Sequence, residues 1–400
     1  MPLQTVSPRI RAFICLNAHP AGCAANVRAQ VERLRREAPG KGLGSVLVIG
    51  SSTGYGLASL VTAVFGYGAR AVGVCLERPP KGDRTASAGW YNLAAVHRLA
   101  RAEGRTVETV VGDAFSDEVR AETIGRLQRA GGNGKIDLVV YSLASPKRTD
   151  PKTGVSYNSE IKPIGAPFKS KNITLSDDKV GTIEIAPASD AEIEATRKVM
   201  GGEDWELWVD ALLGADLLAP GARTVAYSYI GPELTTAIYR SGTIGRAKEH
   251  LEATAHALGD KLRARVGGAA YVSVNKAIVT QASAAIPVVP LYISLLYKVM
   301  KEFGTHEGAP EQIERLFRDH LGPGRTPVLD AGGRIRIDDL EMEPRVQTRG
   351  VGLWPQVTTE NLFEITDYAG FKQEFRALFG FEVPGVDYSV PVETDIQIES

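Results

Sequence analysis

The chain has 400 residues, of which 44% are hydrophobic and 23% are charged, so wholesale disorder is excluded. Its 46 Lys and Arg residues are balanced by 47 Asp and Glu residues, which leaves no basic excess to hold a nucleic-acid partner. Three cysteines cannot form a disulfide framework, and the N-terminal residues lack an apolar signal core. The composition therefore predicts a soluble, cytoplasmic protein.

Apolar strands alternate with helices along much of the chain. Predicted strands cover 45–50, 69–77, 105–113, 135–145 and 224–230, and predicted helices cover 57–68, 88–103, 116–130 and 243–263. Strands separated by helices join into a parallel sheet through right-handed crossovers. An extra edge strand is expected over 10–15 and a helix over 24–38. The pattern predicts an α/β fold with a doubly wound parallel sheet of the Rossmann type, in one enlarged domain over 1–400.

Two segments of the chain are additional to the strands and helices of a minimal fold of this type. Residues 146–222 are expected to form a Lys- and Pro-rich loop followed by a helical pair, and residues 301–400 form a long tail. Ligands bind at the carboxyl ends of the strands in such folds, so both segments are predicted to cover that mouth as a lid.

Residues 277–297 carry no charge over 21 positions, which is long enough to cross a bilayer. Polar residues and two prolines interrupt this run, and no comparable run accompanies it. We therefore expect a buried helix or pocket wall here rather than a membrane segment.

A glycine-rich turn, Gly50-Ser-Ser-Thr-Gly54-Tyr-Gly56, joins a predicted strand to a predicted helix. Glycines permit a tight turn and a close approach to a pyrophosphate, which a helix N-terminus attracts. Glu77 ends the next strand, where a carboxylate can bind a ribose diol and repel a 2′-phosphate. The pattern predicts a dinucleotide site that favours NADH. The alternatives are a solvated Glu77, or an Arg78 that pairs with the 2′-phosphate.

Two further strand ends face the same edge. Asp113 ends the third strand, where it is expected to meet the adenine amino group or to cap the next helix. Leu143 and Ala144 end the fourth strand. They are expected either to lie beneath the nicotinamide part of the cofactor or to serve only as packing residues.

Hydride transfer to a carbonyl or enoyl group needs an acid, and a tyrosine beside a lysine can supply it. Three pairs are candidates. Tyr297/Lys301 and Tyr368/Lys372 have a spacing of four, whereas Tyr239 and Lys248 have eight residues between them. A spacing of four is common in short-chain dehydrogenases and favours the first two pairs. Position in the fold favours Tyr239/Lys248 instead, because this pair follows the fifth strand, beside the expected nicotinamide. The residues alone leave this choice open.

Other motifs carry less chemistry. Cys15, His19 and Cys23 offer only three ligands, so they are interpreted as buried thiols and a loop histidine, and no metal is expected. Five further histidines are expected to be solvated: His97, His250, His256, His306 and His320. Neither GxSxG nor HExxH occurs, which removes support for a hydrolase. The basic loops at 145–154 and 162–172 are either solvated or hold the phosphates of a thioester carrier.

Several segments together resemble one known family. They are GSSTGYGLAS, VCLERP, VVYSLASP, AYSYIGPELT with IYRSGTIGRAK, VTQASAAIPVVPLY, FICLNAHPAGC and LFEITDYAGFKQEFRALFGF. The chain resembles, over essentially its whole length, the bacterial NADH-dependent enoyl-acyl-carrier-protein and trans-2-enoyl-CoA reductases. A tyrosine and a lysine separated by eight residues are the hallmark of that family, which favours Tyr239/Lys248.

The resemblance implies roles for individual residues. Tyr239 would donate the proton, Lys248 would bind the nicotinamide ribose, and Tyr229 and Thr280 would contact the substrate, with Thr280 beginning its helix. The cofactor would be held by Gly50, Ser51, Ser52, Thr53, Gly54, Tyr55, Leu76, Glu77, Asp113, Ala114, Leu143, Ala144, Ala277, Ile278 and Val279.

The implied reaction is NADH-dependent reduction of the C2=C3 bond of a trans-2-enoyl thioester, the last step of fatty acid elongation. Tyr239, with help from Tyr229, would stabilise or protonate the thioester oxygen. The partner would be a thioester of acyl carrier protein or coenzyme A, and the family implies a monomer. Two alternatives remain: a carbonyl (3-ketoacyl) reductase of the short-chain dehydrogenase group, and a non-catalytic NAD sensor.

Overall fold

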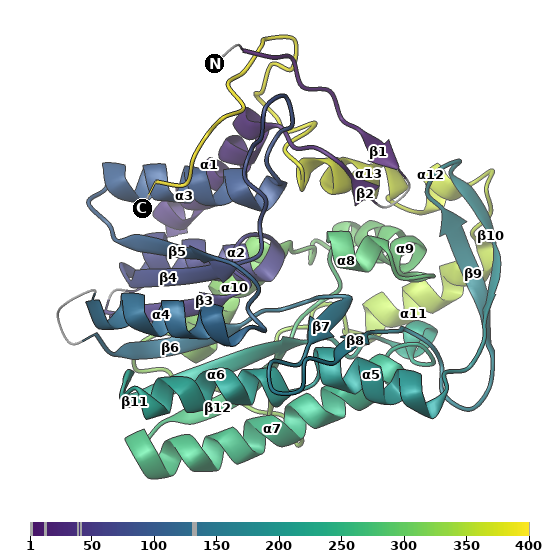
Figure 1. Cartoon of the computed structure of the whole chain (residues 1–400). Coiled ribbons are helices and arrows are strands. Elements are labelled where there is room, and N and C mark those ends of the chain that lie inside the picture. The colour runs from purple at the N-terminus through teal and green to yellow at the C-terminus, as the bar shows by residue number, and fades with distance from the viewer. Residues whose placement is uncertain (1–2, 12–13, 38–39, 41, 130–133, 400) are drawn as a thin grey trace.

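The computed structural model describes residues 3–11, 14–37, 40, 42–129 and 134–399. At its centre lies a seven-stranded sheet in the order β13-β12-β11-β6-β3-β4-β5, with every neighbouring pair parallel (Figure 1). The strands are β3 (Ser45–Ile49), β4 (Arg70–Cys75), β5 (Val107–Val111), β6 (Ile136–Tyr141), β11 (Leu218–Ser228), β12 (Ala269–Val274) and β13 (Arg334–Arg336). All five predicted strands of the sheet are confirmed, while β12 and β13 were not predicted.

Helices cover both faces of the sheet, because alternate strand residues point to opposite sides. Val46 and Val48 pack into one apolar cluster, and Leu47 and Ile49 pack into another. The first cluster includes α1 (Pro20–Glu37), α2 (Gly54–Val61), α3 (Ala88–Ala102) and α10 (Ala309–Leu316). The second includes α4 (Asp117–Arg129), α6 (Glu203–Gly214) and α7 (Thr243–Val266). The doubly wound parallel sheet is thereby confirmed.

The predicted edge strand over 10–15 is wrong. β1 (Ile10–Arg11) and β2 (Ile14–Cys15) pair with each other in a separate antiparallel hairpin, and residues 12–13 lie outside the described residues. Ile10 and Ile14 are 37% and 39% exposed, so this segment has no apolar face to bury against the main sheet.

The segment 146–222 contains more regular structure than expected. Its predicted loop forms two antiparallel hairpins, β7 (Lys147–Thr149) with β8 (Ser156–Asn158) and β9 (Phe168–Thr174) with β10 (Lys179–Ile185). The predicted helical pair is present as α5 (Asp190–Met200) and α6. Ile173 is buried and Phe168 and Ile183 pack on the same apolar cluster as the next segment, which explains the second hairpin.

Most of the uncharged run at 277–297 is buried, as predicted, whereas Gln281, Ala282 and Ala285 in and after its first short helix are exposed. It forms α8 (Gln281–Ala284) and the first part of α9 (Val289–Glu302), with Pro287 and a Val288 of φ +73° between them. Leu291, Ile293 and Leu295 are each at most 1% exposed. Among the described residues, no helix combines the length and apolar character needed to cross a membrane.

The tail returns to the body of the molecule at several places. β13 extends the sheet, and α11 (Pro344–Leu353) and α13 (Tyr368–Ala377) pack against α9, with the short α12 (Leu362–Ile365) before α13. Near the C-terminus, the Trp90 Nε1 donates to the Ile396 carbonyl (2.8 Å) and the Tyr91 hydroxyl to the Thr394 carbonyl (2.7 Å). The last residues therefore lie along α3 (Figure 1).

Candidate active site

The turn between β3 and α2 requires its glycines. Gly50 has φ +88°, and a Cβ there would lie 2.2 Å from the Ser142 carbonyl oxygen. A Cβ on Gly56 would lie 1.8 Å from the Gly50 oxygen. Around Gly54, the first residue of α2, the nearest atom to such a Cβ is Thr280 Cγ2 at 3.8 Å. The first turn of α2, with its free N–H groups, is thus open to a phosphate-bearing ligand, so the turn fits a dinucleotide.

The residues of this turn have different surroundings. Ser51 is buried and its N–H donates to the Val74 carbonyl (3.1 Å), whereas Thr53 is exposed. The Tyr55 hydroxyl donates to the Lys276 carbonyl (2.7 Å). Tyr55 therefore ties the turn to the residues that follow β12.

Glu77 is held in place after β4. Both of its carboxylate oxygens accept hydrogen bonds, one from Ser52 Oγ (2.6 Å) and the other from Ser87 Oγ. Leu76 is 73% exposed beside it, and Arg78 is exposed. The Glu77 carboxylate is thus fixed next to the glycine-rich turn.

The next two strand ends lie at the same edge. Asp113 is exposed, and its Oδ1 accepts from the Phe115 N–H (3.0 Å) in a local turn, while Ser116 Oγ accepts from Val119 N–H (3.2 Å) at the start of α4. Ala114 is buried. The Leu143 side chain lies beside Gly50, and Ala144 is exposed.

Tyr239 lies between β11 and α7, with only 6% of its surface exposed. Its ring meets the ring of Tyr229 edge to face, with centroids 4.9 Å apart and planes at 87°. Burial raises the pKa of Tyr239 above its ordinary value, and the negative charge of Glu341 raises it further. The phenol therefore keeps its proton at neutral pH.

Lys248 lies in the second turn of α7. Its ammonium donates to the carbonyl of Tyr227 (3.2 Å). Tyr227 lies near the carboxyl end of β11, two residues before Tyr229, so the ammonium lies at that strand end. Desolvation lowers the pKa of Lys248 to about 8, although the nearby Glu252 opposes this shift.

The residues after β12 lie at the same carboxyl edge of the sheet, beside the end of β11. The Ala277 N–H donates to Glu341 Oε2 (2.7 Å), and the Ala277 carbonyl accepts from Lys276 Nζ (2.8 Å). The Ile278 carbonyl accepts from Ser283 Oγ (2.8 Å), and the Val279 N–H donates to the Tyr297 hydroxyl (3.2 Å). Thr280 caps α8 by accepting from the Ser283 N–H (2.9 Å).

The competing Tyr/Lys pairs lie in other contacts. The Tyr297 hydroxyl donates to Glu374 (2.9 Å), and Lys301 pairs with Asp367 (2.5 Å). Both members of the other pair bind Asp178: the Tyr368 hydroxyl at 2.8 Å and the Lys372 ammonium at 2.7 Å. These two pairs connect α9, α13 and the β9–β10 hairpin.

Sequence reasoning missed two charged residues of the site, Lys276 and Glu341, which are 2% and 0% exposed. It also misplaced His97, which is buried and shares a hydrogen bond with Thr109 (2.8 Å) rather than facing solvent. Cys15, His19 and Cys23 are buried, and within the described ranges no cluster of three or more His, Cys, Asp or Glu residues could hold a metal ion.

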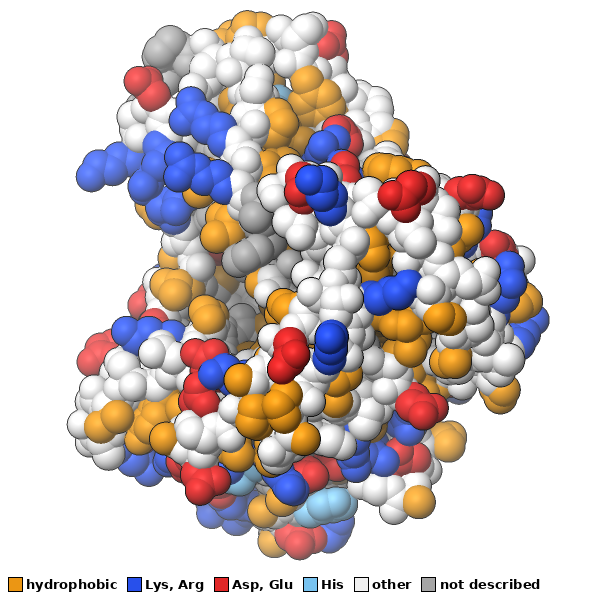
Figure 2. Space-filling view, turned by 90° about the vertical axis from the view of Figure 1, so that its right-hand side faces the viewer, with side chains coloured by type: hydrophobic (Ala, Val, Ile, Leu, Met, Phe, Trp, Pro, Cys, Tyr) orange, Lys and Arg blue, Asp and Glu red, His pale blue; other side chains and the backbone are white. Residues whose placement is uncertain are grey.

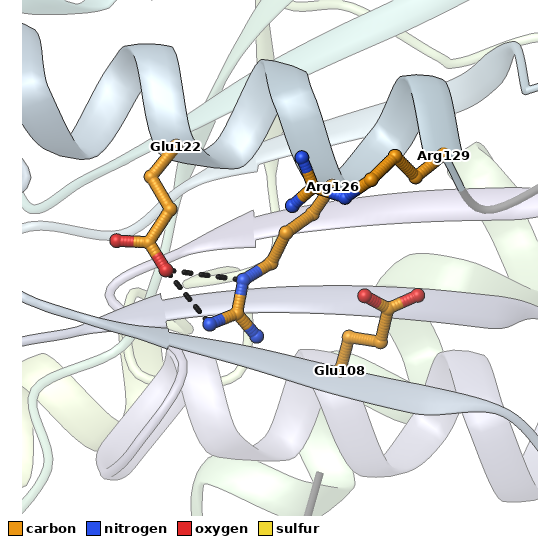
Figure 3. Close-up of a pocket in the computed structure, with 4 residues that line it drawn as sticks. All are labelled: Glu108, Glu122, Arg126 and Arg129. Atoms are coloured by element: carbon orange, nitrogen blue, oxygen red, sulfur yellow. Dashed lines mark hydrogen bonds and ion pairs between the residues drawn. The ribbon is translucent and has the colours of Figure 1, made fainter.

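The surface has two hollows, one on the side of the site and one elsewhere. Figure 2 shows the side toward which the strands' carboxyl ends point; it is hollowed at mid-height, below a group of Lys and Arg side chains. A separate hollow of about 350 Å³ lies between β5 and α4, lined by Glu108, Glu122, Arg126 and Arg129 (Figure 3). Arg126 is paired with Glu122 there (2.7 Å), and Glu108 belongs to the amino half of the edge strand, so we assign this hollow no part in the chemistry.

Comparison with known proteins identifies the family. A family model described as the trans-2-enoyl-CoA reductase catalytic region matches residues 84–321, and one described as the NAD(P)H binding domain of trans-2-enoyl-CoA reductase matches residues 5–82. The chain belongs to the trans-2-enoyl-CoA reductase family. The expected resemblance is thereby confirmed.

Relatives match along the whole chain. An enoyl-[acyl-carrier-protein] reductase [NADH] of Flavobacterium johnsoniae is 54% identical and covers 99% of both chains. A trans-2-enoyl-CoA reductase [NADH] of Ruminiclostridium cellulolyticum is 51% identical and covers 98% of this chain and 99% of its own. The crystal structure of Treponema denticola trans-2-enoyl-CoA reductase in complex with NAD superposes with a TM-score of 0.93 at 48% identity, covering 99% of this chain and 100% of that one.

A third family model, described as an enoyl reductase FAD binding domain, matches residues 329–392. The residues present do not fit a flavin nucleotide. The segment's aromatic side chains Trp354, Tyr368, Phe371 and Phe375 are buried in the apolar cluster that it shares with α9. Its paired glycines, 332 and 333, lead into the three-residue β13 rather than into a helix, and α11 begins after the acidic Glu343, which would repel a pyrophosphate. We therefore assign no flavin chemistry to this segment.

Proposed function

We propose that this protein reduces the C2=C3 bond of trans-2-enoyl thioesters with NADH, giving saturated acyl thioesters in the last step of fatty acid elongation. The observation that carries the proposal is the placement of a buried tyrosine, Tyr239, against Tyr229 at the end of β11, with Lys248 at the same strand end. Within a family of NADH-dependent enoyl reductases, this arrangement supplies the acid that the reaction needs. We further propose that the protein acts as a cytoplasmic monomer.

The proposed cofactor site runs along the carboxyl ends of the strands. Its phosphate end consists of Gly50, Ser51, Ser52, Thr53, Gly54 and Tyr55. Its adenosine end consists of Leu76, Glu77, Asp113 and Ala114, and its nicotinamide end of Leu143, Ala144, Lys248, Ala277, Ile278 and Val279. When bound, NADH supplies the hydride for C3 of the enoyl thioester. Glu77, fixed by two serines, favours a free ribose diol over a 2′-phosphate.

The chain's own residues handle the charge and the proton. As the double bond is reduced, negative charge develops on the thioester oxygen. Tyr239, protonated because burial raises its pKa, donates a hydrogen bond or the proton itself to that oxygen. The Lys248 ammonium holds the nicotinamide ribose and adds positive charge near the phenol. Tyr229 contacts the substrate beside Tyr239.

The acyl chain is proposed to lie against α8 and α9, beginning at Thr280, where buried apolar side chains form a wall. The segments 146–222 and 301–400 are proposed to cover the mouth of this pocket. Lys147, Lys152 and Lys169 on the basic loops are exposed and free to meet the phosphates of a coenzyme A or carrier-protein thioester. In contrast, Lys171 donates to the carbonyls of Pro355 (2.7 Å) and Val357 (2.6 Å) and so anchors the tail.

The experiment that tests this function follows NADH oxidation by absorbance with crotonyl-CoA as substrate. We expect turnover, formation of butyryl-CoA and slower turnover with NADPH. A parallel assay with acetoacetyl-CoA distinguishes the carbonyl reductase: turnover there, with none on crotonyl-CoA, would overturn the proposal. Tight NADH binding without turnover of either substrate would instead favour a non-catalytic sensor.

A further inference from the structure

Glu341 is a buried carboxylate that the tail inserts beside the two tyrosines of the site. It follows β13, 64 positions away from Ala277 in the chain, and none of its surface is exposed. A buried carboxylate needs hydrogen-bond donors, and Glu341 has three. The hydroxyls of Tyr229 (2.9 Å) and Tyr292 (2.6 Å) donate to Oε1, and the Ala277 N–H (2.7 Å) donates to Oε2.

We propose that Glu341 is a positioning residue, which binds the hydroxyl proton of Tyr229 and so leaves Tyr239 as the donor to the thioester oxygen. This inference rests on the proposed function and deepens it. A tyrosine has one hydroxyl proton to donate. Since Tyr229 gives its proton to Glu341, Tyr229 can only accept hydrogen bonds at the site. Tyr239 forms no side-chain hydrogen bond with another described residue, so its proton remains available.

The geometry explains how the carboxylate acts at a distance. Tyr292 and the Ala277 N–H hold Glu341 from two sides, and Glu341 in turn fixes the Tyr229 hydroxyl. With its hydroxyl anchored, the Tyr229 ring stands perpendicular to the Tyr239 ring at 4.9 Å. Such edge-to-face pairs are directional, so a rotated Tyr229 would also release Tyr239.

The charge of Glu341 is compensated locally. Burial raises its pKa, while the donated hydrogen bonds and the positive charge of Lys276 oppose that rise. Lys276 is buried as well, and its ammonium lies 4.8 Å from the centre of the Tyr297 ring. The three donors need an acceptor on both oxygens. An amide keeps only one acceptor oxygen, so its NH₂ group would face either the two tyrosine hydroxyls or the Ala277 N–H, and Gln cannot reproduce all three contacts.

The test compares Glu341→Gln with the wild-type protein in crotonyl-CoA turnover and in NADH binding measured by fluorescence. We expect kcat to fall about tenfold, as is typical when a supporting residue is removed. A change in the Kd for NADH reports the separate contact of Glu341 with Ala277 and should be the same in the Tyr229→Phe background. In the Tyr229→Phe background the same substitution should cost less than about twofold, because the group that Glu341 positions is absent. An equal loss of kcat in both backgrounds would overturn the proposal.

Glu374→Gln is the matched control, since Glu374 accepts from another buried tyrosine, Tyr297, and has no contact with Tyr229. Because the Tyr297 hydroxyl also accepts from the Val279 N–H, the control is read from coupling: any change in kcat caused by Glu374→Gln should be the same in the wild-type and Tyr229→Phe backgrounds. A spectroscopic readout is independent of turnover: in protein with isotope-labelled tyrosine, Glu341→Gln should shift the ring NMR signals of Tyr229 and Tyr239 and leave that of Tyr368 in place. Unmoved Tyr229 and Tyr239 signals would contradict the positioning role even if the enzyme proved to have another substrate.

Should Glu341→Gln fail to fold, Tyr292→Phe weakens the same anchor more mildly. It removes one of the three donors and keeps the ring. A smaller loss of kcat that disappears in the Tyr229→Phe background supports the proposal, and a loss that persists there contradicts it.

Discussion

Ser52 donates a hydrogen bond of 2.6 Å to Glu77, and thereby joins the glycine-rich turn after β3 to the acidic residue after β4. The other oxygen of Glu77 accepts from Ser87, so the carboxylate has one orientation. Glu77, which would bind the ribose, is therefore oriented by the same turn that would bind the pyrophosphate. In the proposed cofactor site, the choice of cofactor and the binding of its phosphates would thus be structurally coupled.

The Glu77→Ala substitution should narrow the preference for NADH over NADPH by about tenfold or more, because it removes a negative charge that repels the 2′-phosphate. The measurement is the ratio of kcat/KM for the two cofactors. Glu108→Ala, which removes an acid from the neighbouring strand β5, is the control and should leave the ratio unchanged. An unchanged ratio in Glu77→Ala would refute the ribose assignment.

Activity should decline as the pH rises through about 8. The pKa of Lys248 is lowered to about 8, so the ammonium that we propose binds the ribose loses its proton above that pH. The alkaline limb of kcat/KM for NADH reports this group in the free enzyme. In Lys248→Arg the guanidinium stays charged, and the limb should move well above pH 8. A limb that stays near pH 8 in this variant belongs to another group, such as Lys276.

Stability should depend strongly on a buried ion pair behind the site. Arg120 and Asp204 are 4% and 2% exposed and lie 2.8 Å apart, and the Tyr141 hydroxyl donates to the same carboxylate (3.0 Å). Asp204→Ala removes the buried anionic partner of Arg120 and leaves only Asp117, whose side chain is 69% exposed, to pair with it (2.7 Å), which should cost about 3–5 kcal/mol in urea unfolding. Loss of the exposed Glu194–Arg197 pair in Glu194→Ala should cost less than about 1 kcal/mol. Equal costs would contradict this account.

The sheet was predictable because local pattern determines it. The apolar runs at β3, β4, β5 and β6 are covered on both faces and are separated by amphipathic helices. β13 was missed because its sequence, RIR, has one apolar residue, Ile335, and its pairing with β12 depends on the position of the whole tail. The β9–β10 hairpin was missed because its lysines mask the alternation of its apolar residues.

The candidate site likewise contains residues that the local sequence indicated and one that it did not. Gly50, Glu77, Tyr239 and Lys248 each occupy a recognisable place relative to a strand end, so spacing and family resemblance pointed to them. Glu341 stands in the acidic run DDLEMEP, which reads as solvated surface. Only the return of the tail brings its carboxylate to Ala277 and Tyr229, and no local signal in the sequence encodes that return.

The most direct test of the central claim is the turnover of crotonyl-CoA by Tyr239→Phe, measured beside the Kd for NADH. The substitution keeps the ring that packs on Tyr229 and removes the hydroxyl alone. We predict that kcat falls by about 10²–10³ while NADH binds as it does to the wild-type protein. Wild-type turnover in the variant would contradict the assignment of Tyr239 as the proton donor.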